Sequence, residues 1–279
     1  MEVTENGPVR ACVRIERKYL DSVIVQDIYM YHEIPRIDIK NTVDWKEHQI
    51  FLKDYFPVDV HANEAVFDIQ YGNVARPTHA NTSWDFAKFE VCHHKWLDVS
   101  EEGYGVSVFN DCKYGVSVRG SNIGLSMLKS PVYPNPEADK EHHEFTYSIY
   151  PHRGSWKEAG TVARAYEFNN PMTAVVKENE GGSLSPEYSF LRVDQENVVI
   201  ETAKMAEQGE ELIVRLYECC NKRSRVVLTC GEPLAEASEC NLMEEKDIPA
   251  EYTEHTVVFD MKPYEIKTIK ITWKNRPSK

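Results

Sequence analysis

The chain has 279 residues, of which 42% are hydrophobic and 28% charged, a globular composition that excludes a disordered protein. Its formal net charge is −13, and an acidic surface repels phosphates and anionic lipids. We therefore expect no nucleic acid and no membrane among its partners, whereas a neutral ligand is compatible with this charge.

The first seventy residues alternate between apolar and polar side chains. Residues 9, 11, 13 and 15 are apolar, the charged residues 10, 14 and 16 alternate with them, and the stretch 37–45 repeats the pattern. A period of two predicts half-buried strands, and the turn-forming runs at 6–8, 21–22 and 34–36 separate them. Strand character continues at 67–70, 104–109, 114–118, 124–128 and 144–150.

One helix is predicted near 155–168. Ser155 and Glu158 have the spacing of a capping box, in which each side chain binds the other residue's amide. Trp156, Ala159, Ala163 and Tyr166 then fall on one helical face, and Asn169-Asn170-Pro171 ends the helix.

The polar run 178–183 has no periodicity and predicts a domain boundary. We therefore expect a large β domain over 1–180 and a smaller one over 184–279. The second part has short strands at 198–202, 212–218, 225–228, 256–259 and 266–273, which predict a small antiparallel sandwich.

The seven cysteines are irregularly spaced, and no two form a Cys-x-x-Cys pair. This pattern indicates free thiols in a reducing cytoplasm, and it makes a cysteine-type zinc site unexpected. No apolar run reaches the ~18 residues that span a bilayer. The polar first ten residues do not predict a signal peptide.

Polar and aromatic residues are concentrated in the loop 76–85, which places Trp84 beside Asp85. A sugar site needs an aromatic face for C–H groups and carboxylates or amides for hydroxyls. The alternative is that Asp85 and its polar neighbours form turns while Trp84 lies in the core.

The second polar segment is 110–115, directly after an apolar strand. A tight Asn-Asp turn between strands explains it without a ligand. At the rim of a cleft, the same segment would present Asn110, Asp111, Lys113 and Tyr114 to a substrate.

The third segment, 128–136, leaves a strand and contains three prolines. A stiff loop loses little entropy on binding, so it makes a good site wall, although it also serves as an inert connector. Lys129 and Ser130 are its candidate wall residues.

The histidines do not predict a metal site. His93-His94 and His142-His143 are adjacent pairs, and neighbours on a strand point to opposite faces. The sequence also lacks glycine-rich phosphate-binding loops and a G-x-S-x-G nucleophile motif. We therefore expect no metal and no cofactor within this chain.

An ordered series of longer motifs resembles the C-terminal region of family 38 α-mannosidases, nearest to the cytosolic and bacterial branch. The likeness runs from near the start to about Pro171 and continues weakly through 214–218. Its strongest part lies between 67 and 98. The matching segments are 5–10, 34–38, 44–49, 67–73, 76–79, 81–85, 87–92, 94–96, 104–107, 110–115, 128–131 and 134–139.

The resemblance implies a galactose-mutarotase-like β supersandwich followed by a small β-sandwich. It also implies a retaining exo-α-mannosidase of mannose metabolism, whose N-terminal catalytic domain supplies the zinc ion and the Asp nucleophile. This chain matches neither of those segments, so it would hold no catalytic residue and no metal. It would pack on the catalytic domain as a scaffold and lend walls to the mannoside cleft.

Two other interpretations stay open. The chain could be a free-standing carbohydrate-binding or mutarotase-like module, with His79 and Glu90 as one acid–base pair. It could also be a structural or oligomerisation domain with an exposed apolar patch. A homo-oligomer is compatible with each interpretation.

Overall fold

The computed structural model describes residues 1–176, 181 and 185–274. The chain forms two compact units, Met1–Met172 and Thr173–Lys279. Nearly all regular structure is antiparallel strand, which confirms the all-β prediction. The predicted boundary at 178–183 lies, apart from Gly181, outside the described residues, so that boundary stays a prediction.

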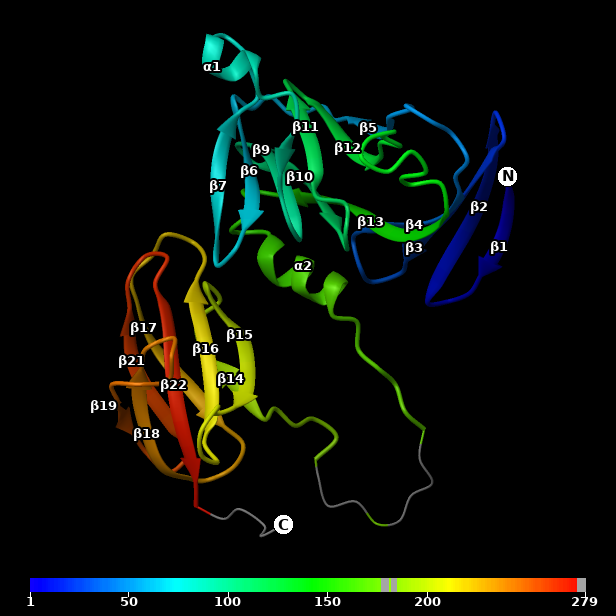
Figure 1. Cartoon of the computed structure of the whole chain (residues 1–279). Coiled ribbons are helices and arrows are strands. Elements are labelled where there is room, and N and C mark those ends of the chain that lie inside the picture. Colours follow the sequence, from blue (N-terminus) through cyan, green and yellow to red (C-terminus); the bar gives the residue numbers. More distant parts are fainter. Residues whose placement is uncertain (177–180, 182–184, 275–279) are drawn as a thin grey trace. The chain divides into compact units, whose positions relative to one another are not determined.

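A nine-stranded antiparallel sheet is the framework of the first unit (Figure 1). Its outer strands follow from the alternating pattern of the sequence, which is typical of a half-buried strand, whereas the central strands β9 and β10 are buried on both faces. The strands are, in spatial order, β1 (Glu2–Asn6), β2 (Arg10–Tyr19), β3 (Ser22–Tyr31), β4 (Ile37–Asp44), β13 (His142–Arg153), β10 (Tyr104–Asn110), β9 (Trp96–Glu101), β6 (Glu64–Ile69) and β7 (Gly72–Pro77).

A four-stranded sheet covers part of the large one. Its order is β5 (Leu52–Pro57), β12 (Asn122–Leu128), β11 (Gly115–Arg119) and β8 (Val91–Cys92). The apolar core lies between the two sheets, where Leu97 and Val108 of the large sheet pack with Val116 and Ile123 of the small one. The small sheet ends at β5, whereas the large sheet continues through β3 and β2 to β1.

Two helices interrupt the strands of this unit. Helix α1 (Ser83–Phe86) lies in a segment that was predicted to be a loop. Helix α2 (Thr161–Asn169) lies against β9 and β10. The capping box forms, with Ser155 N donating to Glu158 Oε2 over 2.8 Å. It caps only a turn, because Gly160 adopts a left-handed φ of 63° and the helix begins after it. The predicted helix near 155–168 is therefore present but starts at Thr161.

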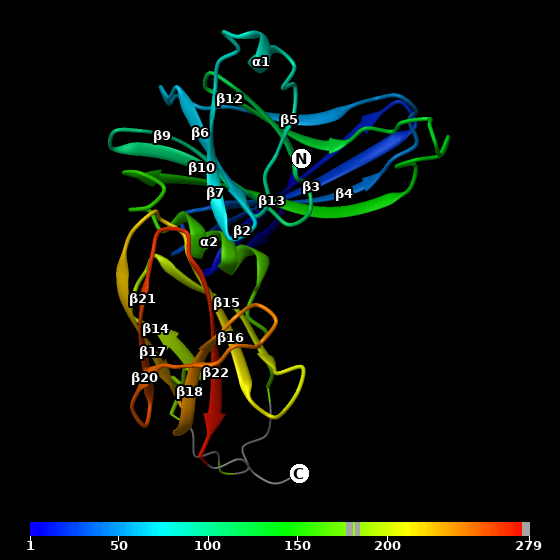
Figure 2. The ribbon, with the colours of Figure 1, turned by 60° about the vertical axis from the view of Figure 1, so that its left-hand side comes forward.

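The second unit is a two-sheet antiparallel sandwich, as predicted (Figure 2). Its core contains Leu216, Leu228 and Ile269, all fully buried. One sheet is β14 (Leu191–Val193), β17 (Ser224–Cys230), β21 (Thr256–Met261) and β20 (Glu251–Tyr252); the other is β15 (Val198–Met205), β16 (Leu212–Glu218), β22 (Ile266–Trp273), β18 (Leu234–Cys240) and β19 (Ile248–Pro249).

Truncating a core leucine of the second unit tests this packing. Leu216→Ala is expected to lower the free energy of unfolding by about 2–5 kcal/mol, because it leaves a cavity in a closed core. The control Leu242→Ala removes a side chain that is 54% exposed, so its effect should stay within about 0.5 kcal/mol. Urea unfolding measures both, and equal effects would contradict the described core.

Candidate functional site

The loop between β7 and β8 is held in shape by its own polar groups. Thr82 caps α1, accepting from the amide of Asp85 over 3.3 Å. The Asp85 carboxylate in turn accepts from the Thr82 hydroxyl over 2.8 Å and from the Thr82 amide over 3.2 Å. The hydroxyl bond is the main reason that the pKa of Asp85 is lowered. Asp85 therefore shapes this loop.

The same loop exposes three large apolar side chains. Trp84 is 81% exposed, Phe86 71% and Phe89 68%. The Phe86 and Phe89 rings touch edge to face, with centroids 6.0 Å apart. Trp84 is thus outside the core. Exposed aromatic residues gathered on one loop are typical of a contact surface.

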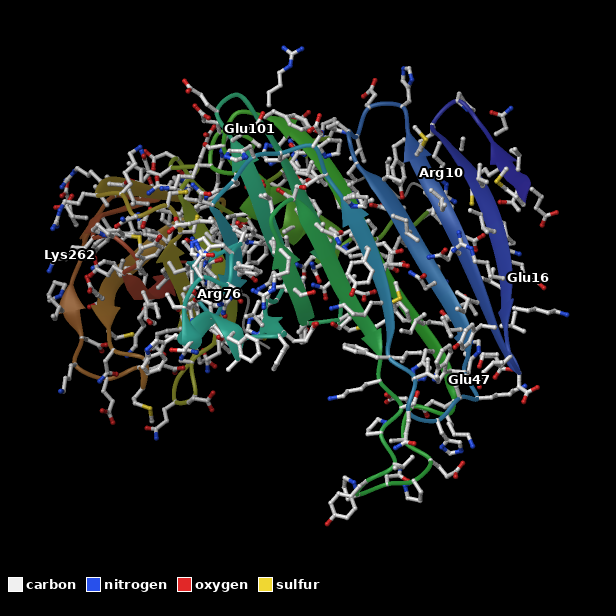
Figure 3. All side chains as sticks on the ribbon, turned by 90° about the horizontal axis from the view of Figure 1, so that it is seen from above. Arg10, Glu16, Glu47, Arg76, Glu101 and Lys262 are labelled. Carbon is white, nitrogen blue, oxygen red and sulfur yellow. The ribbon has the colours of Figure 1, made fainter. Side chains whose placement is uncertain are left out.

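Arginine side chains fasten this loop to the sheets beneath it. Arg76, labelled in Figure 3, lies on β7. It lies over the Phe67 ring at 4.6 Å and donates to the Cys92 carbonyl over 3.0 Å. Burial lowers the pKa of Arg76. Arg119, on β11, donates to the Lys88 carbonyl over 2.8 Å. These bonds fix both ends of the loop, so the exposed aromatic residues have a firm base.

The second predicted segment divides into a buried and an exposed part. Asn110 is fully buried, and its amide nitrogen donates to the His94 carbonyl over 2.5 Å and lies 2.8 Å from His93 Nε2. Asp111 is exposed and accepts from the Thr146 amide over 2.8 Å. Asn110 therefore holds strands together, and only the residues after it reach the surface.

Lys113 and Tyr114 lie at that surface. The Lys113 ammonium lies 4.6 Å from the centre of the Phe145 ring, and Tyr114 meets His94 edge to face at 5.2 Å. Tyr114 is 45% exposed. A cation and a phenol on a strand-to-strand turn can donate to hydroxyl groups of a ligand.

The third segment is anchored through Ser130. Its hydroxyl accepts from Trp45 Nε1 over 2.5 Å, and its amide donates to Asp139 over 2.9 Å. Ser130 is fully buried, whereas the side chain of Lys129 is exposed. Of the two predicted wall residues, Lys129 alone faces solvent.

The structure links the second and third segments to each other. The positive charge of Lys113 lies close enough to Asp139 to help lower the pKa of its carboxyl group. The same carboxylate accepts hydrogen bonds from the amides of Lys129 and Ser130. Among the residues that the structure describes, no hydrogen bond, ion pair or ring contact joins these segments to Trp84. The predicted residues therefore form two separate patches, one around α1 and one around Lys113.

Glu90 and His79 do not form the acid–base pair of the alternative interpretation. Glu90 binds the ammonium of Lys53 and the hydroxyl of Ser126 on the small sheet. His79 lies beside Asp85 in the hollow under the α1 loop. His93 is fully buried, and burial lowers its pKa to about 3.

The described ranges 1–176, 181 and 185–274 contain neither a cluster of metal ligands nor a membrane-spanning helix. No three His, Cys, Asp or Glu side chains there converge to hold a metal ion. These residues do not fit a zinc site. No helix in the same ranges is long and apolar enough to cross a bilayer.

Family models match both units of the chain. The model described as the glycosyl hydrolases family 38 C-terminal domain matches residues 1–137, and the family 38 C-terminal beta sandwich domain matches residues 197–269. The chain belongs to glycosyl hydrolase family 38 and corresponds to the C-terminal region of the proteins of that family. This confirms the family resemblance seen in the motifs.

Relatives in this family are longer proteins. The chain is 36% identical over 280 residues to "Alpha-mannosidase G" of Dictyostelium discoideum, covering 96% of this chain and 26% of that protein. It is 41% identical over 230 residues to "Alpha-mannosidase 2C1" of Homo sapiens, covering 81% and 22%. The chain thus spans about a quarter of the length of these relatives.

A solved structure shares the fold. The crystal structure of an alpha-mannosidase from Enterococcus faecalis V583 superposes with a TM-score of 0.82 at 19% identity, over 97% of this chain and 35% of that one. The fold shared with that structure therefore extends over both units of the chain.

The burial of His93 predicts a pH dependence of stability. The His93 pKa is about 3 in the folded chain and 6.5 in the unfolded one. Between these values the unfolded state binds the extra proton, so stability falls as pH falls from 6.5 towards 3, by at most about 1.36 kcal/mol per pH unit. Burial of the ring is the main cause of the lowered pKa, and the Tyr114 carbonyl, 3.1 Å from Nδ1, opposes it only in part.

Urea unfolding at several pH values checks this. His93→Gln should show a flatter loss of stability between pH 6.5 and 4 than the parent chain. His142→Gln, at an exposed position, should keep the parent slope. The same slope in all three proteins would contradict the neutral, buried His93.

Proposed function

We propose that the chain is the C-terminal part of a retaining, zinc-dependent exo-α-mannosidase. The observation that carries this is the similarity to α-mannosidases, which extends over 96% of the chain in one relative and 81% in another. The relatives are about four times longer, so the zinc ligands and the nucleophile would lie in their other regions. The substrate class is a terminal α-mannoside.

The chain's own contribution would be a scaffold and part of the cleft wall. Retention requires two carboxyl groups about 5 Å apart on either side of the scissile bond. In the described chain, the predicted acids have other tasks, since Asp85 completes the capping box of α1 with Thr82 and Asp111 accepts from the Thr146 amide. Other groups on fixed loops remain available. The exposed Trp84 can make an apolar contact, and the exposed Tyr114 and Lys129, with the half-buried Lys113, can donate hydrogen bonds.

The exposed aromatic residues of the α1 loop support docking on a catalytic domain. Arg76 and Arg119 fasten the loop to the sheets, and the loop exposes Trp84, Phe86 and Phe89. Because the loop is already held in place, it loses little entropy when a partner covers it. We assign the protein to the cytoplasm because all seven cysteines are free thiols, and to mannose catabolism because its relatives are α-mannosidases.

Reconstitution of the enzyme tests the division of labour. The chain alone should not hydrolyse an aryl α-mannoside with zinc supplied, and activity should appear when the separately expressed upstream region is added. Hydrolysis by the chain alone would refute the proposal, because a complete catalytic set would then lie within these residues.

Trp84→Ala tests the docking patch. In the reconstituted enzyme it should weaken association of the two parts by about tenfold or more, since a central aromatic side chain often contributes ≥ 2 kcal/mol, or about thirtyfold, to an interface. Met243→Ala removes another large apolar side chain, 75% exposed, from the second unit and should change association less than about twofold. Titration of one part with the other, read out by activity and calorimetry, measures both, and equal effects would contradict the assignment.

A further inference from the structure

A second candidate site lies inside the first unit, where the large sheet extends past the small one. Strands β2 and β3 turn one face towards edge strand β5, and a cavity of ≈ 270 Å³ opens between them. This volume is just below the ~300 Å³ at which ligand pockets begin, so it suits a small molecule. The lining residues are Arg17, Gln26, Ile28, Ile37, Ile39, Asp54, Tyr55, Phe56, Tyr147 and Ile149.

A fixed polar network forms one wall of this cavity. Gln26 donates to Asp54 over 3.3 Å and to the buried Asn41 over 3.0 Å, and it lies 3.2 Å from the Tyr147 hydroxyl. Tyr147 donates its hydroxyl proton to the same oxygen of Asp54, and Asn41 donates to the Ile39 carbonyl over 3.1 Å. The orientation of Gln26 and the carboxylate is therefore set before any ligand arrives.

Two opposite charges border the cavity without pairing. Arg17, exposed on β2, donates to Gln26 Oε1 over 2.5 Å, and Asp54 is half-buried on β5. Neither forms an ion pair with any residue in the described part of the chain. On the other face of the same two strands, by contrast, Arg14 pairs with Asp27 over 2.7 Å. The Gln26 amide bridges the two groups, because its oxygen accepts from Arg17 and its nitrogen donates to Asp54, so a guanidinium and a carboxylate lie close together at the rim of the cavity.

The rest of the lining is apolar and aromatic. Ile28, Ile39 and Ile149 come from the large sheet, and Phe56 and Tyr55 come from β5. The cavity has hydrogen-bond donors and acceptors at its rim and apolar and aromatic surface behind them. This arrangement is complementary to a ring that carries hydroxyls on its edges and C–H groups on its faces. An anion would be repelled by Asp54, and a cation by Arg17.

We propose that this cavity is a binding site for a neutral polyhydroxylated ligand of the size of a single sugar ring, with Asp54 accepting from its hydroxyls and Arg17 donating to them. The site belongs to this chain alone and does not depend on the proposed glycosidase reaction. Its small buried area predicts weak binding, with a Kd of about 1–10 mM.

Saturation-transfer NMR of the 279-residue chain with D-mannose, D-glucose and D-galactose tests the site. At least one sugar should bind saturably, and Arg17→Met and Asp54→Asn should each weaken it by about tenfold or more, as expected for a lost bond to a charged group. The matched controls Arg14→Met and Asp27→Asn change the same strands on the opposite face and should stay within about twofold.

Each outcome decides the proposal. It is overturned if none of the three sugars binds saturably to the parent chain, or if the controls weaken binding as much as the site variants do. Arg17 is exposed, so its variant should fold even if Asp54→Asn does not, and unchanged affinity in Arg17→Met would also overturn the proposal. Loss of sugar binding with normal assembly of the reconstituted mannosidase would show that the two sites are separate.

Discussion

The unequal width of the two sheets in the first unit determines where its side chains can be buried. Four strands cover nine, so the closed core lies between β9, β10 and β13 on one side and β11 and β12 on the other. Beyond β5 there is no covering strand in the described chain, and the inner face of β2 and β3 stays open to the cavity that Asp54 and Arg17 border. The loop with α1 leaves the opposite end of the large sheet, after β7.

The loops around the candidate site are shaped by buried polar groups. Asn110 ties β10 to the His93–His94 segment, and Ser130 receives the Trp45 indole proton. Such bonds satisfy donors and acceptors that would otherwise be costly to bury. They also leave Tyr114 and Lys129 exposed on a firm base, which suits a region that is covered by another domain or by a substrate.

Strand prediction succeeded because alternation is a local pattern, although it did not show that Cys12, between Arg10 and Arg14 on the charged face of β2, is the buried residue of that strand. The helix start failed because the left-handed Gly160 separates the capping box from α2. Asn110 and Ser130 were predicted at a cleft rim, yet both are buried, and residue type alone does not reveal this. The cavity was missed because Tyr147 lies 121 residues from Gln26 and 93 from Asp54, a separation that only the sheet register closes.

Hydrogen–deuterium exchange tests the central claim most directly, namely that this chain lends its exposed loops to a larger enzyme. Exchange would be compared between the isolated chain and the longer protein that carries it. The account predicts slower exchange at 79–90 and 110–114 in the longer protein, with the exposed turn around Met243 unchanged. Equal exchange at 79–90 and 110–114 in the two proteins would contradict it, because those loops would then be covered by nothing.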